Sequence, residues 1–205
     1  MNWRPTASLD TLTMRARMLS RARRFFDERD VLEVDTPALG SHTASDPHIE
    51  SLTAQSPSGE SWFLHSSPEY RMKRLLAAGS PDIYQISHVF RGSERGRCHQ
   101  PEFCMIEWYR HGLSLTDIAT ETCELLNALG EAASRPVDAI SRYRYTQAFQ
   151  ETTGLDPLNC ELDALKRRAS RLPATSDPAL HISLGDDRSA WLDLLMSHCV
   201  IPALP

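Results

Sequence analysis

The spacing of apolar residues predicts a helix and a short strand at the start of the chain. Over residues 9–29 apolar side chains recur at helical spacing, and the arginines of this stretch fall mostly on the other faces. The apolar positions are Leu12, Met14, Met18, Ala22, Phe25 and Phe26. The run at 31–34 predicts a strand that stops at Pro37, since proline has no amide hydrogen for a strand ladder. The pattern indicates an amphipathic helix packed on a sheet, followed by a polar loop at 42–47.

A predicted hairpin precedes a second helix. Residues 49–54 and 62–65 have the apolar content of strands, and turn-forming residues separate them. Ser67 then suits a helix N-cap and Pro68 suits the first helical turn. Glu69 lies where the helix dipole favours an anion, which is a complete structural explanation of this residue.

Two longer strands flank a polar loop in the middle of the chain. Residues 83–90 and 103–109 are rich in β-branched and aromatic side chains, and the loop between them contains two glycines. Strand alternation predicts one face of the second strand with Phe103, Met105, Glu107 and Tyr109, and an opposite face with Glu102, Cys104, Ile106 and Trp108.

The last third of the chain reads as helical. A capping-box pattern at 114–117 opens a helix with a buried leucine stripe, and Gly130 is expected to end it. Residues 162–172 and 187–199 are further predicted helices. His198, in the last of them, is typical of a core or surface histidine rather than a ligand.

Composition favours an ordinary globular protein. The chain has 205 residues, 41% hydrophobic and 24% charged, which is enough for one domain with a sizeable core. Its net charge of −5 gives no bulk attraction to nucleic acid and argues against a broad tRNA-binding surface. No signal core or membrane-spanning apolar stretch is apparent, so a cytoplasmic protein is expected.

The five cysteines do not predict a disulfide framework or a zinc ribbon. They are an odd number, widely spaced, and no CxxC pair occurs, so reduced thiols are the simplest interpretation. Cys98 and His99, with Cys104 nearby, could suggest zinc, but a second ligand pair at a usual spacing is lacking. We therefore expect no metal site from these residues.

The candidate chemistry lies on the face of the second strand that carries Glu107. An aromatic ring, a carboxylate and a phenol form one row, and Arg91 enters from the neighbouring strand. Arginine suits carboxylates and phosphates because its planar fork binds two oxygens at once. Arg95, Arg97 and His99 on the loop would add positive charge near a polyphosphate. The alternative is an exposed hairpin with a solvated basic loop, in which Glu107 merely pairs with an arginine.

The same residues resemble a known family. Phe90-Arg91, Arg97, residues 99–103 (His-Gln-Pro-Glu-Phe) and residues 107–109 (Glu-Trp-Tyr) are similar to motif 2 of class II aminoacyl-tRNA synthetases of the lysyl branch. This branch includes short paralogues that attach (R)-β-lysine to a lysine of elongation factor P. Residues 32–39 resemble motif 1 of the same family, and the resemblance covers nearly all of the chain.

The resemblance implies an α+β fold with a class II synthetase-like antiparallel sheet flanked by helices. It places one catalytic core over residues 1–205, with motif 1 at about 12–39, motif 2 at about 86–110 and a helical insertion at about 143–200. Motif 1 forms the dimer interface in that family, so a homodimer is implied. No anticodon-binding domain precedes motif 1, and the chain stops before any motif 3, so the fold is expected to be incomplete at its C-terminus. Residues 185–188 (Gly-Asp-Asp-Arg) echo motif 3 only superficially.

The resemblance also implies a reaction, in which ATP activates a lysine-type amino acid as an aminoacyl-adenylate. Arg91 would be catalytic, bridging the substrate carboxylate and the α-phosphate. The implied ATP-binding residues are Arg91, Ser93, Glu94, Arg97, His99, Gln100 and Phe103, with Phe103 stacking on adenine. The implied substrate-binding residues are Ser67, Glu69, Glu107 and Tyr109. Ser93 stands where the lysyl enzymes commonly have a glutamate, so contact with the nucleotide must shift to Glu94 or to the backbone.

Three functions remain open from the sequence. The first is a ligase that transfers lysine or (R)-β-lysine to elongation factor P, present as a truncated form or a fragment. The second is a lysyl-tRNA synthetase-like core, although a tRNA partner is not expected without an anticodon-binding domain. The third is a non-catalytic module that dimerises or binds ligand, because motif 3 and its magnesium ligands are absent from this chain. Mg²⁺ is expected for the family beside ATP.

Overall fold

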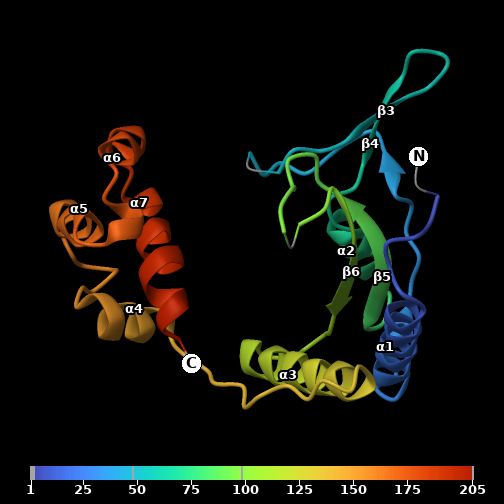
Figure 1. Cartoon of the computed structure of the whole chain (residues 1–205). Helices are drawn as coiled ribbons and strands as arrows, with labels where there is room; N and C mark the ends of the chain where they lie inside the picture. The colour runs from blue at the N-terminus through green and yellow to red at the C-terminus, as the bar shows by residue number, and fades with distance from the viewer. Residues whose placement is uncertain (1–2, 48, 98, 205) are drawn as a thin grey trace. The chain divides into compact units, whose positions relative to one another are not determined.

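The computed structural model describes residues 3–47, 49–97 and 99–204. The chain divides into two compact units, Met1–Asp138 and Ala139–Pro205 (Figure 1). Each unit has its own hydrophobic core. The boundary lies close to the start of the helical insertion that the resemblance implies at about residue 143. Among the described residues, no helix combines the length and the apolar content needed to cross a membrane.

The first unit is built on a three-stranded sheet in the order β1-β5-β6. Its strands are β1 (Leu32–Glu33), β5 (Ile83–Phe90) and β6 (Glu102–Tyr109). β5 and β6 are antiparallel, as predicted, and Gln85 lies opposite Glu107 in their register. β1 pairs parallel to β5, so this part of the sheet is not antiparallel as expected. The long connection from β1 to β5, which holds a second sheet and a helix, gives the chain the length that a parallel crossover needs.

Helices α1 (Leu9–Asp27) and α3 (Leu115–Ala132) cover one face of this sheet. Ser8 begins α1, because its Oγ accepts a hydrogen bond from the Thr11 amide. Phe26 stacks on Tyr84 of β5 with ring centroids 4.3 Å apart and also meets Trp108 of β6. The amphipathic helix predicted at 9–29 is therefore confirmed as a helix packed on a sheet. The opposite face of the sheet, with Met105 and Glu107, is left for the cavity described below.

A second sheet, in the order β2-β4-β3, precedes α2 (Glu69–Ala77). Its strands are β2 (Leu39–Gly40), β3 (Thr53–Gln55) and β4 (Ser61–Leu64). The predicted hairpin is confirmed, although its first strand is shorter and later than 49–54. The N-cap prediction was wrong in register, since Pro68 and not Ser67 holds the N-cap position of α2. Ser67 Oγ still accepts a hydrogen bond from the Glu69 amide at 3.1 Å, so its side chain satisfies one amide of the first turn.

The start of α3 was predicted correctly and its end was not. Ser114 and Asp117 form a reciprocal capping box. Gly130 lies inside the helix and is buried, and the helix continues to Ala132. A Cβ at Gly130 would overlap the carbonyl oxygen of Arg135 and the side chain of Val137. The glycine is therefore needed for the close approach of the next segment, not for ending the helix.

The second unit is helical. It contains α4 (Tyr145–Thr153), α5 (Leu162–Ser170), α6 (Pro178–Leu184) and α7 (Arg188–Leu195), with a π-helical turn at Met196–Val200 and 3-10 turns at Pro173–Thr175 and Ile201–Ala203. The helices predicted at 162–172 and 187–199 are confirmed, the second in two parts. Trp191 and Leu195 are buried with Phe149 and Leu165 in the core. His198 is exposed, in agreement with a surface histidine.

Residues 185–188 have structural roles throughout. Asp187 caps α7 by accepting hydrogen bonds from the amides of Ser189 and Ala190. Asp186 pairs with Lys166 at 2.6 Å. Arg188 donates to the backbone carbonyls of Pro157, at 2.9 Å, and of Cys160. The side chains of Asp186, Asp187 and Arg188 are thus explained by hydrogen bonds and an ion pair within the second unit.

Candidate active site

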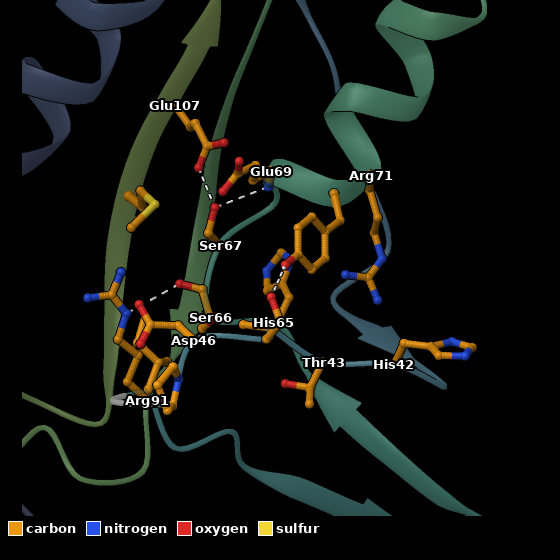
Figure 2. Close-up of a pocket in the computed structure, with 16 residues that line it drawn as sticks. His42, Thr43, Asp46, His65, Ser66, Ser67, Glu69, Arg71, Arg91 and Glu107 are labelled. Carbon is orange, nitrogen blue, oxygen red and sulfur yellow. Dashed lines mark hydrogen bonds between the residues drawn. The ribbon is translucent and has the colours of Figure 1, made fainter.

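A cavity of about 720 Å³ lies on the face of β6 that carries Glu107. Its walls come from β6, from Arg91 just after β5, from residues 65–67 and the first turn of α2, and from residues 42–47 and 49, which the sequence predicts as a polar loop leading into a strand. Figure 2 shows Glu107, Glu69 and Ser67 gathered at one end of this cavity and Arg91 at another. The structure therefore brings together four residues that the sequence assigns to one site.

Glu107 is held from two sides by hydroxyl groups. Ser67 Oγ donates to one carboxylate oxygen at 2.5 Å, and Tyr109 Oη donates to the other at 2.6 Å. Burial raises the pKa of Tyr109, and its hydrogen bond to Glu107 raises it further, so the phenol keeps its proton. The two donors fix the carboxylate in one orientation. The predicted shared face of Glu107 and Tyr109 is confirmed, and Tyr109 acts on the carboxylate itself.

Glu69 stands at the first turn of α2 beside this pair. Its carboxylate forms an ion pair with Lys73, one helical turn later, at 2.5 Å. The Glu69 side chain is 44% exposed and still lines the cavity. Ser67 connects both acids, because its Oγ accepts from the Glu69 amide while it donates to Glu107. Glu69 is thus the first residue of a helix and also lines the cavity, so its position is compatible with both the structural and the substrate-binding interpretation.

Arg91 follows β5 and lies between the cavity and the β5–β6 loop. Its Nε donates to the Ser66 carbonyl at 3.4 Å, and its Nη1 lies 3.4 Å from Glu94 Oε1. The guanidinium carbon is 5.1 Å from the centre of the Phe103 ring. Arg91, Glu94 and Phe103 therefore form one cluster. Glu94 is the acid that meets Arg91, while Ser93 donates to Glu50.

The remaining predicted residues lie on the exposed loop between β5 and β6. Arg97, His99 and Gln100 are exposed and do not line the cavity. His99 Nε2 is 3.7 Å from Glu94 Oε2, so this histidine lies beside the Arg91 cluster. Cys98, the residue behind the zinc alternative, lies outside the described residues. Within the described residues, no group of three or more His, Cys, Asp or Glu side chains is placed to hold a metal ion.

The sequence did not reveal the part of the cavity formed by residues 42–47 and 49 and by Tyr70, Arg71 and His65. Ser45 and Tyr70 share a hydrogen bond at 3.1 Å, which fastens this segment to α2. His65 is buried, and its Nε2 bonds the His88 carbonyl at 2.9 Å. The available signal was the density of hydrogen-bonding side chains at 42–46, which has no helical or strand period.

The distribution of charge defines what the cavity can bind. One region has the carboxylates of Glu69 and Glu107, and another has the Arg91 guanidinium; Asp46 and Arg71 also line the cavity. A small molecule with an ammonium group and a carboxylate or phosphate would satisfy both regions at once. Buried carboxylates and cations are stabilised when such opposite charges meet them.

Comparisons with known proteins identify the family of the chain. Residues 1–177 match the family described as tRNA synthetases class II (D, K and N). The chain is 39% identical over 207 residues to the elongation factor P–(R)-β-lysine ligase of Actinobacillus succinogenes, covering 98% of this chain and 61% of that protein. Its identity to the ligases of the same name is 41% over 201 residues in Vibrio parahaemolyticus and 39% over 206 residues in Pasteurella multocida. These matches cover 96% and 98% of this chain, and 59% and 60% of those proteins. The chain spans about six tenths of the length of these curated relatives, and it belongs to the class II tRNA synthetase family.

Proposed function

We propose that this chain provides the amino-acid site of an ATP-dependent ligase that activates a lysine-type amino acid and transfers it to a lysine of elongation factor P. The observation that carries the proposal is Glu107, fixed by Ser67 and Tyr109 in the same cavity as Arg91. A positioned carboxylate opposite a guanidinium fits an amino acid that has an ammonium on its side chain. The name shared by the relatives identifies (R)-β-lysine and elongation factor P as their substrates.

The proposed reaction proceeds in two steps. A carboxylate oxygen of the amino acid first bonds to the α-phosphorus of ATP, and pyrophosphate leaves. The neutral amine of the acceptor lysine then attacks the activated carbonyl carbon, and AMP leaves with the bonding electrons. Sites of this kind act by positioning the reactants and neutralising charge, so the protein needs no covalent intermediate. Arg91 would bridge the carboxylate and the α-phosphate, where negative charge gathers.

The two carboxylates would receive the two ammonium groups of the amino acid. Glu107 has free lone pairs beyond those used by Ser67 and Tyr109, since a carboxylate accepts about four hydrogen bonds. Glu69 is paired with the exposed Lys73, so a substrate ammonium would compete with that side chain. An exposed pair of this kind contributes little, which makes the exchange feasible.

The nucleotide would lie along β6 and the β5–β6 loop. Phe103 offers a ring for adenine, and Arg97 and His99 offer donors for the phosphates from an exposed loop. Gln100, Ser93 and Glu94 complete the proposed ATP-binding residues. Mg²⁺ is expected beside ATP in this family, and we propose no ligand for it from the described residues.

We also propose the finer organisation that the family implies. Motif 1 would occupy residues 12–39, motif 2 residues 86–110 and the helical insertion residues 143–200, within a class II synthetase-like antiparallel sheet. The tie between motif 1 and the sheet supports this assignment, because the Thr36 amide and hydroxyl both donate to Gln85 Oε1 of β5. A homodimer formed through motif 1 would follow.

Titration of the chain with ATP and then with (R)-β-lysine, α-lysine and the other protein amino acids would test the proposal. Calorimetric binding that is strongest for (R)-β-lysine, together with ATP–pyrophosphate exchange on that amino acid, is the expected result. Preference for α-lysine with transfer to tRNA would instead indicate a tRNA synthetase. A folded sample that binds neither ATP nor a lysine-type amino acid would refute the proposal.

A further inference from the structure

Glu50, which precedes β3, is attached to the start of the loop that joins β5 and β6. Its carbonyl oxygen accepts a hydrogen bond from the Gly92 amide at 2.8 Å. Its carboxylate accepts a hydrogen bond from Ser93 Oγ, across a sequence separation of 43 residues. The backbone and the side chain of Glu50 together therefore hold this carboxylate against the loop.

The missing side chain at Gly92 lets the carboxylate lie across the loop backbone. A Cβ at Gly92 would come within 3.1 Å of the carboxylate carbon of Glu50 and within 3.3 Å of its Oε2. These separations are shorter than ordinary van der Waals contact, so any side chain at position 92 would displace the acid. Gly92 and Ser93 thus leave a place that this one side chain fills.

The carboxylate lies close to the residues to which we assign the nucleotide. Gly92 directly follows Arg91, whose guanidinium carbon is 5.1 Å from the centre of the Phe103 ring. Ile49 and Arg91 both line the cavity, and Glu50 and Gly92 are the next residues of the same two segments. The contact between Glu50 and the loop is therefore at the rim of the cavity, one residue along the chain from the Arg91–Phe103 pair.

Two acids stand at this rim, and cations match only one of them. Glu94 Oε1 lies 3.4 Å from Arg91, and Glu94 Oε2 lies 3.7 Å from His99. In the described part of the chain, Glu50 forms no ion pair, and its carboxylate accepts a hydrogen bond from Ser93 alone. A carboxylate can accept about four hydrogen bonds, so most of the lone pairs of Glu50 stay available.

The contacts proposed so far for the nucleotide do not distinguish one base from another. Arg91 and the loop would bind phosphates, which all nucleoside triphosphates share. Stacking on Phe103 is also tolerant, because every base has a π-face. The 6-amino group of adenine is a hydrogen-bond donor, whereas guanine has a carbonyl acceptor at the same position. A carboxylate at the edge of the base would accept from adenine and repel guanine.

We propose that Glu50, held by Ser93 and given room by Gly92, selects adenine by accepting a hydrogen bond from its 6-amino group. This inference rests on the proposed function and adds base selection to it. Ser93 stands where the lysyl enzymes commonly have a glutamate, so the acid at this place comes from another segment of the chain. The assignment replaces the expectation that Glu94 or the backbone takes over the contact.

Calorimetric titration of the 205-residue chain with two nucleotides tests the inference. The probes are ATP and purine riboside 5′-triphosphate, which lacks only the 6-amino group. One hydrogen bond at an exposed site predicts that the wild-type chain binds ATP about 3- to 10-fold more tightly. Glu50→Ala should abolish this preference and keep the affinity for purine riboside triphosphate within about 2-fold, which shows that the variant is folded. Ser93→Ala should reduce the preference, because the carboxylate loses the hydroxyl that holds it.

Glu60→Ala is the matched control, since Glu60 is an exposed acid just before β4 and does not line the cavity. It removes the same charge and should keep the preference of the wild-type chain. Glu94→Gln should change the affinity for both nucleotides alike. Equal affinity of the wild-type chain for the two nucleotides would overturn the inference. A preference that survives in Glu50→Ala and disappears in Glu94→Gln would also overturn it, by assigning the base contact to Glu94.

The amino acid (R)-β-lysine is titrated into the same wild-type sample, so that the two proposals can fail separately. Binding of (R)-β-lysine and of both nucleotides, without a preference for ATP, would refute the role of Glu50 alone. Binding of none of the three would refute the proposed function, and this inference with it.

Discussion

Glu107 shows how a single carboxylate becomes selective through its neighbours. The hydroxyls of Ser67 and Tyr109 each donate to one of its oxygens, so its orientation is set before a ligand arrives. Tyr109 keeps its proton and donates it to Glu107, since burial and the nearby carboxylate raise its pKa. An ammonium that enters the cavity thus meets an acceptor whose position does not need to change.

Glu107→Gln is expected to weaken binding of a lysine-type amino acid by about 10- to 100-fold, because a charged hydrogen bond contributes roughly 1.5–3 kcal/mol. Binding of ATP should change by less than about 2-fold, since the nucleotide is assigned to other residues. Calorimetry measures both. Glu102→Gln, at the exposed start of the same strand and on its other face, is the control and should change neither. Equal losses in the two variants would remove Glu107 from the amine site.

His65 makes stability depend on pH in a defined direction. Burial lowers its pKa from the usual 6.5, so below that value the unfolded chain binds more protons at this position than the folded chain. The free energy of unfolding should therefore decrease as the pH falls from about 7.5 to about 5.5. Urea unfolding of the wild-type chain and of His65→Gln at both pH values measures the contribution. The variant should lose less stability, while His198→Gln, at an exposed position, should behave as the wild type.

At the scale of elements, a network of charged side chains holds β6 on the side of the sheet opposite the cavity. Glu121 of α3 is buried, accepts a hydrogen bond from Trp108 Nε1 at 3.0 Å and pairs with Arg110 at 3.0 Å. Arg29 approaches the same carboxylate at 3.8 Å and pairs more closely with the exposed Glu124 at 3.0 Å. The strand that presents Glu107 to the cavity is thereby attached to both covering helices.

Glu121→Gln should destabilise the first unit by roughly 1.5–3 kcal/mol, because the buried carboxylate loses its charged contacts with Trp108 and Arg110, although Arg110 keeps Asp82 as a second partner. Glu124→Gln removes an exposed partner of the same Arg29 and should cost less than about 1 kcal/mol. Urea unfolding followed by circular dichroism compares the two. Similar values for both variants would show that the network does not hold the strand.

Short-range patterns account for what the sequence predicted well. Alternation with a period of two placed Met105 and Glu107 on one face of β6, because successive side chains of a strand point to opposite faces. The capping box at Ser114 is a contact within one helical turn, and it was also found. The site residues predicted around Arg91 and Glu107 come from such local patterns and from a family motif that spans them.

Long-range contacts account for what the sequence missed. Gly130 matches the pattern of a helix end, yet it serves a close approach by Val137 that no local pattern encodes. Arg71 has the sequence context of a solvated helix residue, and only the structure shows that Gly40, 31 positions earlier, makes room for it. The parallel pairing of β1 depends on the whole connection to β5. Each of these features follows from parts of the chain that meet only after folding.

At the scale of the whole molecule, the two hydrophobic cores define separate targets for mutation. Leu165 is fully buried in the second core, whereas the cavity belongs to the first unit. Leu165→Ala should destabilise the second unit by about 2–5 kcal/mol, through lost burial and the space left behind. Hydrogen exchange should then speed up in α5 and α7 and stay unchanged in β5 and β6. Faster exchange in all four elements would mean that the units unfold as one, and that the helices after residue 138 support the site itself.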